Sequence, residues 1–157
     1  MDNIEYLTDI GKYEKMFGGL YHAAASRFNL PEVSMWIMYF LIFSEEETTQ
    51  QTIAERMMFP KQTINSATMS LADKGYVTLE KIDGSRRKKI NLTAEGKRFA
   101  EQTVRRILNA EKRAVERMGQ KKIERYIELY GEFYECMSRE FQEEGITAAL
   151  RDGTSHG

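Results

Sequence analysis

The sequence has one cysteine, two histidines and two prolines among its 157 residues. With Cys136 as its single cysteine the chain cannot form an internal disulfide, and two histidines with one cysteine cannot assemble a Cys/His zinc cluster. No segment approaches the roughly 18 uninterrupted apolar residues of a membrane span, and the N-terminus lacks the basic-then-apolar layout of a signal peptide. We therefore expect a cytoplasmic protein without disulfide, metal, cofactor or membrane partner.

The sequence also lacks the arrangements that catalysis requires. It shows no nucleophile beside a base, no phosphate-binding glycine loop and no set of metal ligands, and its acidic residues lie on solvated helix faces. The chain is therefore not expected to be an enzyme. Its composition, 41% hydrophobic and 30% charged, is ordinary for a soluble and mostly helical protein.

Charge is distributed unevenly, although the net charge is only −1. Residues 1–49 carry three Lys or Arg against eight Asp or Glu, whereas residues 50–98 carry ten against five. Residues 99–120 are again basic, and residues 121–144 are acidic. A basic middle on an acidic scaffold is typical of a module that faces DNA, so the near-neutral total does not argue against nucleic acid.

Apolar residues recur every three or four positions in the first part of the chain, which predicts helices. The first helix is expected between residues 4 and 28, with a slight kink or thinning at Gly18-Gly19. Asn29-Leu30-Pro31 ends it, because proline disfavours a helical residue before it. A second helix follows and ends before Glu45-Glu46-Glu47. It is apolar enough to be a core element.

The middle of the chain predicts two helices followed by a hairpin. A short helix over residues 49–57, capped by Thr49, leads through the turn 58–60 into a helix from about Lys61 to Lys74, which Gly75 ends. The period then changes from about 3.6 to 2. Residues 77–81 read as a strand, 82–85 supply turn residues, and 88–92 read as the return strand.

The last part of the chain predicts two further helices. Thr93 can cap a helix that carries an apolar stripe and breaks near Gly119, and another helix runs from Lys121 to beyond Phe141. Their stripes have no partner within the hairpin module, so we assign them, with the first helix, to a dimerisation layer.

The predicted fold class is mainly α (α+β), a winged helix-turn-helix with a small β-hairpin wing and a helical dimerisation layer. The predicted regions are 1–30 and 94–145 for dimerisation, 31–93 for DNA binding, and 146–157 for a flexible C-terminal tail.

Three stretches together resemble the MarR family of transcriptional regulators. They are residues 49–57, then 61–65 with 71–77, then 83–96, in which Lys-Gly-Tyr-Val, a hairpin with arginines and Leu-Thr-x-x-Gly succeed one another. The likeness covers nearly the whole chain in element order. It implies an obligate homodimer with recognition helices in successive major grooves and wings in the flanking minor grooves. It also implies repression, relieved by a small molecule or by oxidation.

The sequence departs from the family pattern in two places. Pro31 and Pro60 stand where many members carry threonine and serine caps. Asp83 lies one place early relative to Arg86, which leaves open whether these two residues form an ion pair in the wing.

The helix that begins at Lys61 is the expected recognition helix. Ile64, Ala67 and Leu71 are expected to point inward, which places polar residues on the outer face. Gln62 and Asn65 carry amides able to contact adenine bidentately, and the helix has no arginine to read guanine, so we expect an A·T-leaning site. Phosphate contacts are assigned to threonine and glutamine side chains near the two helix starts. The alternative is a helix face that is merely solvated.

The densest basic run of the chain, residues 86–89, lies on the predicted wing. Strand alternation would place Arg86 and Lys88 on one side and Arg87 and Lys89 on the other. We expect Arg86 to enter the minor groove, with Arg87 in reserve. The alternative is a charged edge that prevents sheet aggregation. The candidate DNA-binding residues are Thr49, Gln50, Lys61, Gln62, Thr63, Asn65, Ser66, Met69, Arg86, Arg87 and Lys88.

Aromatic residues of the first two helices are candidates for an effector pocket, because an apolar concavity with a few polar tips suits amphipathic aromatic ligands. The alternative, which we favour for most of them, is ordinary core packing. His22 could neutralise an acidic ligand, or be merely packed or solvated. Cys136 lies away from the first-helix position of redox-sensing relatives, so we interpret it as structural. The candidate ligand-binding residues are Tyr13, Phe17, Tyr21, Trp36, Tyr39 and Phe40.

Two functions remain open from the sequence. The first is a dimeric transcriptional repressor that reads a pseudo-palindrome with half-sites about one helical turn apart. The second is a winged-helix module for protein–protein contact without sequence-specific DNA binding. The basic run discriminates between them, because an assembly module has no need of four cations on its wing.

Overall fold

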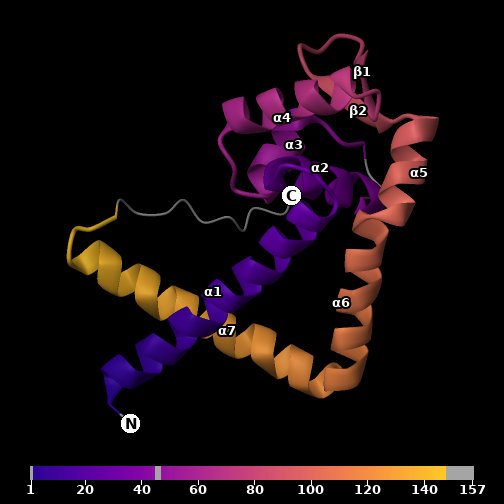
Figure 1. Cartoon of the computed structure of the whole chain (residues 1–157). Coiled ribbons are helices and arrows are strands. Elements are labelled where there is room, and N and C mark those ends of the chain that lie inside the picture. The colour runs from indigo at the N-terminus through magenta and orange to yellow at the C-terminus, as the bar shows by residue number, and fades with distance from the viewer. Residues whose placement is uncertain (1, 45–46, 148–157) are drawn as a thin grey trace. The chain divides into compact units, whose positions relative to one another are not determined.

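The computed structural model describes residues 2–44 and 47–147 and divides at Ala110 into two compact units. The described chain is mainly helical with one small antiparallel hairpin, which confirms the predicted fold class (Figure 1). Most of the predicted tail, residues 148–157, lies outside the described residues, as do Glu45 and Glu46. The elements in chain order are α1 (Asn3–Arg27), α2 (Glu32–Phe43), α3 (Gln50–Arg56), α4 (Lys61–Asp73), β1 (Val77–Lys81), β2 (Lys88–Leu92), α5 (Ala94–Gln102), α6 (Val104–Met118) and α7 (Gln120–Glu143).

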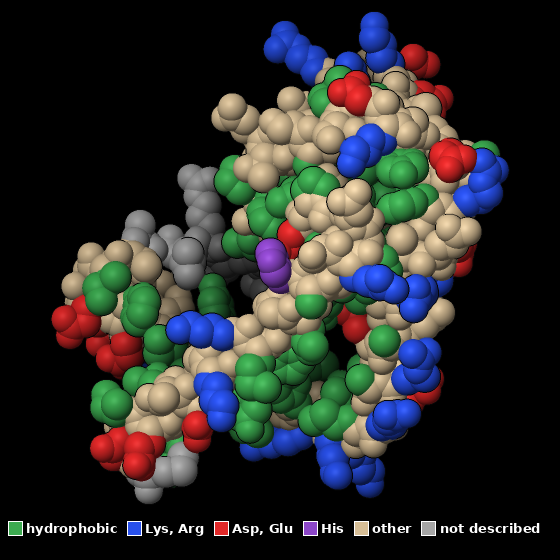
Figure 2. Space-filling view, in the orientation of Figure 1, with side chains coloured by type: hydrophobic (Ala, Val, Ile, Leu, Met, Phe, Trp, Pro, Cys, Tyr) green, Lys and Arg blue, Asp and Glu red, His purple; other side chains and the backbone are tan. Residues whose placement is uncertain are grey.

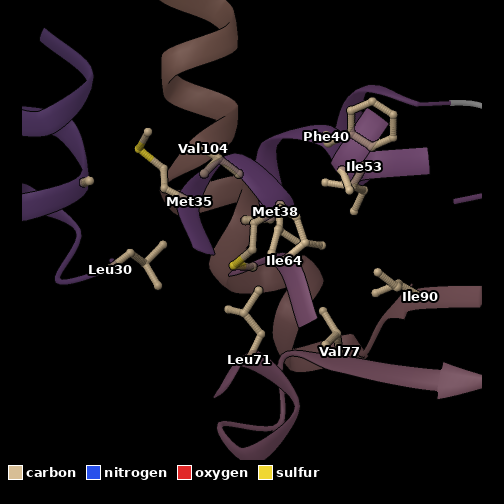
Figure 3. Packing of buried hydrophobic residues seen from close by; sticks show 14 residues of the cluster. Leu30, Met35, Met38, Phe40, Ile53, Ile64, Leu71, Val77, Ile90 and Val104 are labelled. Carbon is tan, nitrogen blue, oxygen red and sulfur yellow. The ribbon is translucent and has the colours of Figure 1, made fainter. Parts of the chain in front are cut away.

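The core of the first unit gathers around α2, as its apolar sequence predicts. Met35, Ile37 and Met38 of this helix are completely buried. Side chains from α3, α4, both strands and α6 converge on it, among them Ile64 and Val104 (Figure 3). Because burying such a side chain contributes about 1.5–3 kcal/mol, this cluster fixes the position of every element of the winged module.

The helix-turn-helix begins with the predicted cap. The Thr49 hydroxyl accepts from the backbone N–H of Thr52 at 3.1 Å, and the Thr52 hydroxyl in turn accepts from the backbone N–H of Thr49 at 2.8 Å. This reciprocal capping box satisfies two backbone donors at the start of α3. Pro31 and Pro60 occupy the N-cap positions of α2 and α4 and provide no side-chain cap.

The hairpin pairs β1 with β2, Val77 opposite Leu92 and Lys81 opposite Lys88. The segment just before α3 also pairs with β2. Thr49 forms an isolated bridge with Lys89, and the backbone N–H of Ile90 donates to the Thr48 carbonyl at 2.8 Å. This bridge, which was not predicted from the sequence, ties the start of α3 to the return strand of the wing.

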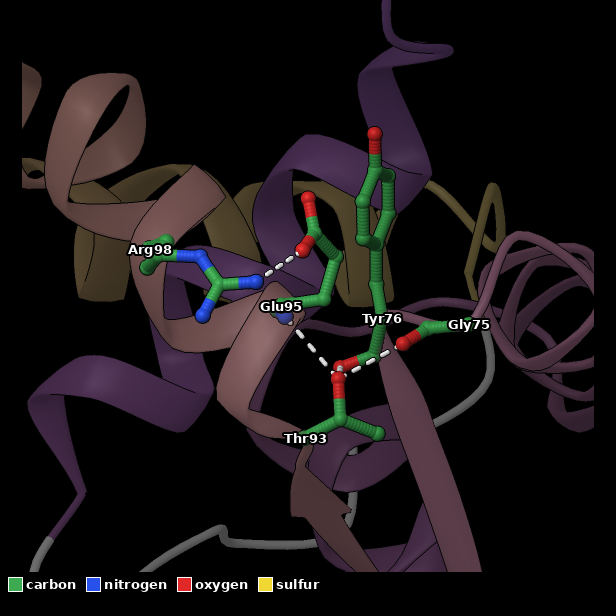
Figure 4. Close-up of polar contacts among 6 residues, drawn as sticks. Gly75, Tyr76, Thr93, Glu95 and Arg98 are labelled. Carbon is green, nitrogen blue, oxygen red and sulfur yellow. Dashed lines mark hydrogen bonds and ion pairs between the residues drawn. The ribbon is translucent and has the colours of Figure 1, made fainter.

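The Leu-Thr-x-x-Gly motif fixes the base of the wing to α5 (Figure 4). The Thr93 hydroxyl donates to the Gly75 carbonyl at 2.6 Å and accepts from the backbone N–H of Gly96 at 2.9 Å. A Cβ atom at Gly96 would lie 1.9 Å from the Tyr76 carbonyl oxygen. Only glycine allows this approach. The Tyr76 ring stacks on Phe99 at 4.5 Å between centroids, and Glu95 pairs with Arg98 beside it.

One sequence-based expectation about the later helices was wrong. The helix predicted from Thr93 to near Gly119 is divided into α5 and α6 at Thr103, whose φ and ψ are −123° and −88°. The Thr103 hydroxyl donates to the Phe99 carbonyl at 2.6 Å, and such local bonding by threonine competes with regular helix geometry. The predicted break near Gly119 is confirmed, and α1 runs as one helix through Gly18-Gly19.

In the second unit, α7 is amphipathic but contains no buried residue. Tyr126 and Tyr130 stack along it with ring centroids 5.8 Å apart, and Cys136 is exposed on the same helix. Within the described residues, every helix is too short or too polar to cross a membrane. The exposed apolar side chains of α7 are Tyr126, Ile127, Leu129, Tyr130, Tyr134 and Phe141.

Candidate nucleic-acid interface

The two faces of α4 differ as the sequence predicts. Ile64 and Leu71 are buried, Ala67 is half-buried, and Thr68 joins them with its hydroxyl bonded to the Ile64 carbonyl at 2.7 Å. The opposite face is exposed along the helix and consists of Lys61, Gln62, Asn65, Ser66 and Met69. The structure thus makes these side chains available to a partner. Their role in reading bases stays a prediction.

A hollow of about 300 Å³ lies where α3, α4 and the wing meet. Lys and Arg side chains project from the end of the molecule where Figure 1 places the hairpin (Figure 2). Glutamine and asparagine carboxamides line the hollow together with Lys and Arg side chains. The lining residues are Thr49, Gln50, Gln51, Lys61, Asn65, Met69, Leu79, Arg86, Arg87 and Lys88. Of the predicted residues, exposed Gln62 and Ser66 and half-buried Thr63 are not among them.

The arrangement of the wing cations differs from the expectation at Arg87. Arg86 and Arg87 precede β2, so strand alternation does not separate them, and both line the hollow with Lys88. Lys89 is half-buried and instead lines a second hollow, of about 180 Å³, together with Lys97. Alternation thus separates Lys88 from Lys89 as expected but not Arg87 from Arg86, because it holds only for extended, paired backbone. Within residues 77–92 no ion pair or hydrogen bond joins Asp83 to Arg86.

The first turn of α3 supplies polar groups to the hollow. Gln50 Nε2 donates to Asn65 Oδ1 at 3.1 Å, which links α3 to the outer face of α4. Thr49 is only 8% exposed and its hydroxyl is engaged in the capping box, so its contact with phosphate stays a prediction.

Two lining residues were not predicted. Gln51 follows Gln50 in the first turn of α3 and donates to Glu55 at 2.7 Å, and Leu79 lies at the middle of β1. Gln51 could have been predicted from the sequence, because it follows the candidate residue Gln50. The place of Leu79 depends on how the hairpin packs, which no local pattern gives.

The candidate effector residues form a row of rings rather than one cluster. Tyr21 packs on Trp36 with centroids 4.6 Å apart, and Trp36 meets Tyr39 edge-on at 5.5 Å. Phe43, which was not predicted although it follows Tyr39 by four residues, extends the row at 6.3 Å. The row lies along α1 and α2, and neither hollow described above includes it.

The remaining candidates lie apart from this row. Tyr13 and Phe17 are exposed on the preceding turns of α1. Phe40 is buried in the core, with the Arg56 guanidinium 5.5 Å from its ring centroid. His22 is exposed, 3.5 Å from the Glu32 carboxylate. The binding of an effector by any of these residues stays a prediction.

Comparison with known proteins gives one family and many similar folds. Residues 28–88 match the model of the MarR family. NMB1585, a MarR family regulator from Neisseria meningitidis, aligns with a TM-score of 0.74 at 22% identity over 92% of this chain and 99% of its own. MepR of Staphylococcus aureus in a DNA complex gives 0.64 at 17% identity over 87% and 99%. Staphylococcus aureus MarR in complex with salicylate and kanamycin gives 0.61 at 18% identity over 87% and 92%. No curated protein matches the chain.

The solved structures and the arrangement of α3, α4 and the hairpin define a winged helix-turn-helix protein with the fold of MarR regulators. Residues 28–88, which span α2 to the start of β2, match the MarR family model, in agreement with the resemblance seen in the sequence.

Proposed function

We propose that the protein is a transcriptional regulator that binds a pseudo-palindromic DNA duplex as a homodimer and acts as a repressor. The observation that carries the proposal is the hollow in which the outer face of α4, the start of α3 and three wing cations meet. A cation-lined concavity beside an exposed helix suits a DNA backbone and the groove next to it.

We assign a different DNA contact to each element of the proposed interface. The major groove, about 12 Å wide, admits an α-helix, and the outer face of α4 carries Gln62 and Asn65 for base edges. Arg86 and Arg87 lie on the exposed loop before β2, and we assign them to the narrower minor groove. Ile64 of α4 is completely buried, and this packing holds α4 rigid on the winged module.

The exposed apolar faces of α1 and α7 support a homodimer. On α1, Ile4, Leu7 and Leu20 are exposed, and on α7 a row of tyrosines and Ile127 is exposed. On each helix, exposed apolar side chains in this number favour an interaction face. A second copy of the chain offers the same faces in return, as a twofold interface requires.

We assign an aromatic effector to the ring row of Tyr21, Trp36 and Tyr39. Half-buried rings give a planar ligand apolar area. Support comes from the solved relatives in complex with salicylate and with 4-hydroxyphenylacetate. Because Trp36 is the single tryptophan of the chain, titration with salicylate should change its fluorescence, and Tyr21→Ala should weaken that response.

The direct test of DNA binding uses a duplex from the protein's own promoter region. Arg86→Ala combined with Gln62→Ala should lower the affinity by at least about tenfold and reduce the salt dependence, since one cation and one base reader are removed. Arg113→Ala with Gln102→Ala removes the same two residue types from exposed positions on α6 and α5 and should change neither. Unchanged affinity and salt dependence in the first variant would refute the assignment and favour a protein-contact module.

A further inference from the structure

Met69 is an apolar side chain on the otherwise polar outer face of α4. The other residues of that face are polar or charged, namely Lys61, Gln62, Asn65 and Ser66. Residues seven apart in an α-helix differ by only about 20° around its axis, so Met69 points outward almost in line with Gln62. Met69 is 44% exposed, and its thioether is at most a weak hydrogen-bond acceptor. The surface proposed to face DNA thus includes one group suited to apolar contact.

The packing of the winged module does not account for Met69. The inner side of α4, with Ile64 and Leu71, is buried in the core on the opposite side of the helix. Among the described residues that line the hollow with Met69, Leu79 is the one other apolar side chain. Leu79 is half-buried and packs against the core, whereas Met69 is exposed. Met69 therefore keeps apolar surface available to a partner.

The position of Met69 along α4 keeps it within the length of helix that DNA can approach. It lies seven residues after Gln62, about 10.5 Å along the axis at about 1.5 Å per residue. Successive base pairs are about 3.4 Å apart, so a helix lying along the major groove places the two side chains about three base pairs apart. Asp73, one turn later, is exposed and acidic, and its carboxylate would repel phosphates. Met69 is thus the last outer-face residue before this acidic end.

The major groove offers an apolar side chain one kind of apolar partner. Adenine, guanine and cytosine present hydrogen-bonding groups there, whereas thymine adds a C5 methyl group beside its O4 acceptor. Methionine is unbranched and polarisable, so it adapts to a small apolar group without a fixed geometry. Contact between the two removes both apolar surfaces from water. Thymine is therefore the base that a methionine on this face favours.

We propose that Met69 is a specificity-determining residue that selects thymine through its C5 methyl group at one base pair of each half-site, about three steps from the pair assigned to Gln62. This inference rests on the proposed function, because it requires the outer face of α4 to face bases. It adds an apolar determinant to the A·T preference that the carboxamides predict. Because Met69 is uncharged, its contribution does not depend on salt.

The test removes the methyl group and leaves base pairing intact. The wild-type chain first selects duplexes from a library with a randomised core of about 20 base pairs, enough for two half-sites one turn apart. Each selected thymine is then replaced by deoxyuridine, which keeps O4. At the Met69 position this should lower the affinity about fourfold in each half-site, the factor for burying one carbon of this size. At the same position 5-methylcytosine should bind more tightly than cytosine by a similar factor.

Substitutions of Met69 identify the thymine that it contacts. In Met69→Ala the side chain is too short to reach the methyl group, so thymine and deoxyuridine should bind equally well at that position alone. Met69→Gln keeps the length but not the apolar character, and should abolish the same preference. Met69→Leu remains apolar and should retain it. Met69→Ala should leave the salt dependence of binding unchanged, and thermal melts should show all variants folded.

Met118→Ala is the matched control. Met118 is 43% exposed, close to the value for Met69, and is the last residue of α6, outside the winged module. It should leave the thymine-to-deoxyuridine affinity ratio unchanged at every position, even if it alters the dimer. Selection of no thymine, or equal ratios in the wild-type chain and Met69→Ala, would overturn the inference while DNA binding stands. If the wild-type chain selects no sequence, the proposed function fails and the inference fails with it.

Discussion

Helices α4 and α7 are both amphipathic, yet they present opposite faces to solvent. In α4 the apolar side is buried, with Ile64 at 0% exposure, and the polar side faces outward. In α7 no residue is buried, and Ile127 on its apolar side is 63% exposed. The apolar side of α4 is thus packed within the first unit, whereas the apolar side chains of α7 are exposed among the described residues.

Because their exposed faces differ, the two helices require different kinds of partner. A polar face mounted on a rigid core, beside three cations, suits a charged and hydrated partner such as DNA. An apolar face without a core suits another apolar face, which a second copy of the chain supplies. The two helices thereby divide the proposed work, with α4 reading and α7 assembling.

The largest expected effect compares two isoleucines. Ile64→Ala should lower the free energy of unfolding by about 2–5 kcal/mol, because it removes buried methyl groups and leaves a cavity. In Ile127→Ala any loss should come only through the dimer, and should therefore shrink as the chain is diluted. Urea denaturation at several protein concentrations measures both. If both variants lost the same unfolding free energy at every protein concentration, the proposed difference between α4 and α7 would be wrong.

The next effect compares two glycines. Gly96→Ala places a Cβ against the Tyr76 carbonyl and should cost about 1–3 kcal/mol or more, because backbone must move. A Cβ at Gly131 of α7 meets nothing within 4 Å in the single chain, so at a dilution where the proposed dimer has dissociated Gly131→Ala should stabilise the chain by about 0.5–1 kcal/mol through helix propensity. Thermal melts of the two variants should shift in opposite directions. A shift in the same direction would refute the account of the wing base.

A smaller effect concerns the dimer alone. Ile127→Asp should raise the dimer dissociation constant at least about tenfold, because a carboxylate would have to enter an apolar interface. Cys136→Asp adds the same charge nine residues later, half a turn around α7, and should change the dissociation constant much less. Sedimentation equilibrium distinguishes them. Identical behaviour of the two variants would exclude the apolar face of α7 from the interface.

The sequence predicted those elements in which buried residues recur at the regular spacing of a helix or a strand. The two faces of α4 and the hairpin strands follow from spacing, because a side chain at the wrong period would lose its place in the core. The Thr49 and Thr93 caps follow from residue chemistry.

What could not be predicted depends on single interactions between particular residues. The division at Thr103 concerns one residue, and the bridge of Thr49 to Lys89 spans one residue pair, too little for any periodic signal. Arg86 and Arg87 were separated by a strand rule that does not reach their loop. The orientation of the Asn65 amide depends on Gln50, fifteen positions earlier, and no local pattern encodes it.

The proposal that α4 and the wing bind DNA is tested most directly by the salt dependence of binding to a duplex from the protein's own promoter region. We predict that log affinity falls linearly with log salt. Arg86→Ala with Arg87→Ala should lower the slope by at least about 1.8, the value for two phosphates, one per protomer, that are no longer neutralised. Arg113→Ala with Arg117→Ala, which removes two exposed arginines from α6, should leave the slope unchanged. A slope that is the same in all three proteins would contradict the account.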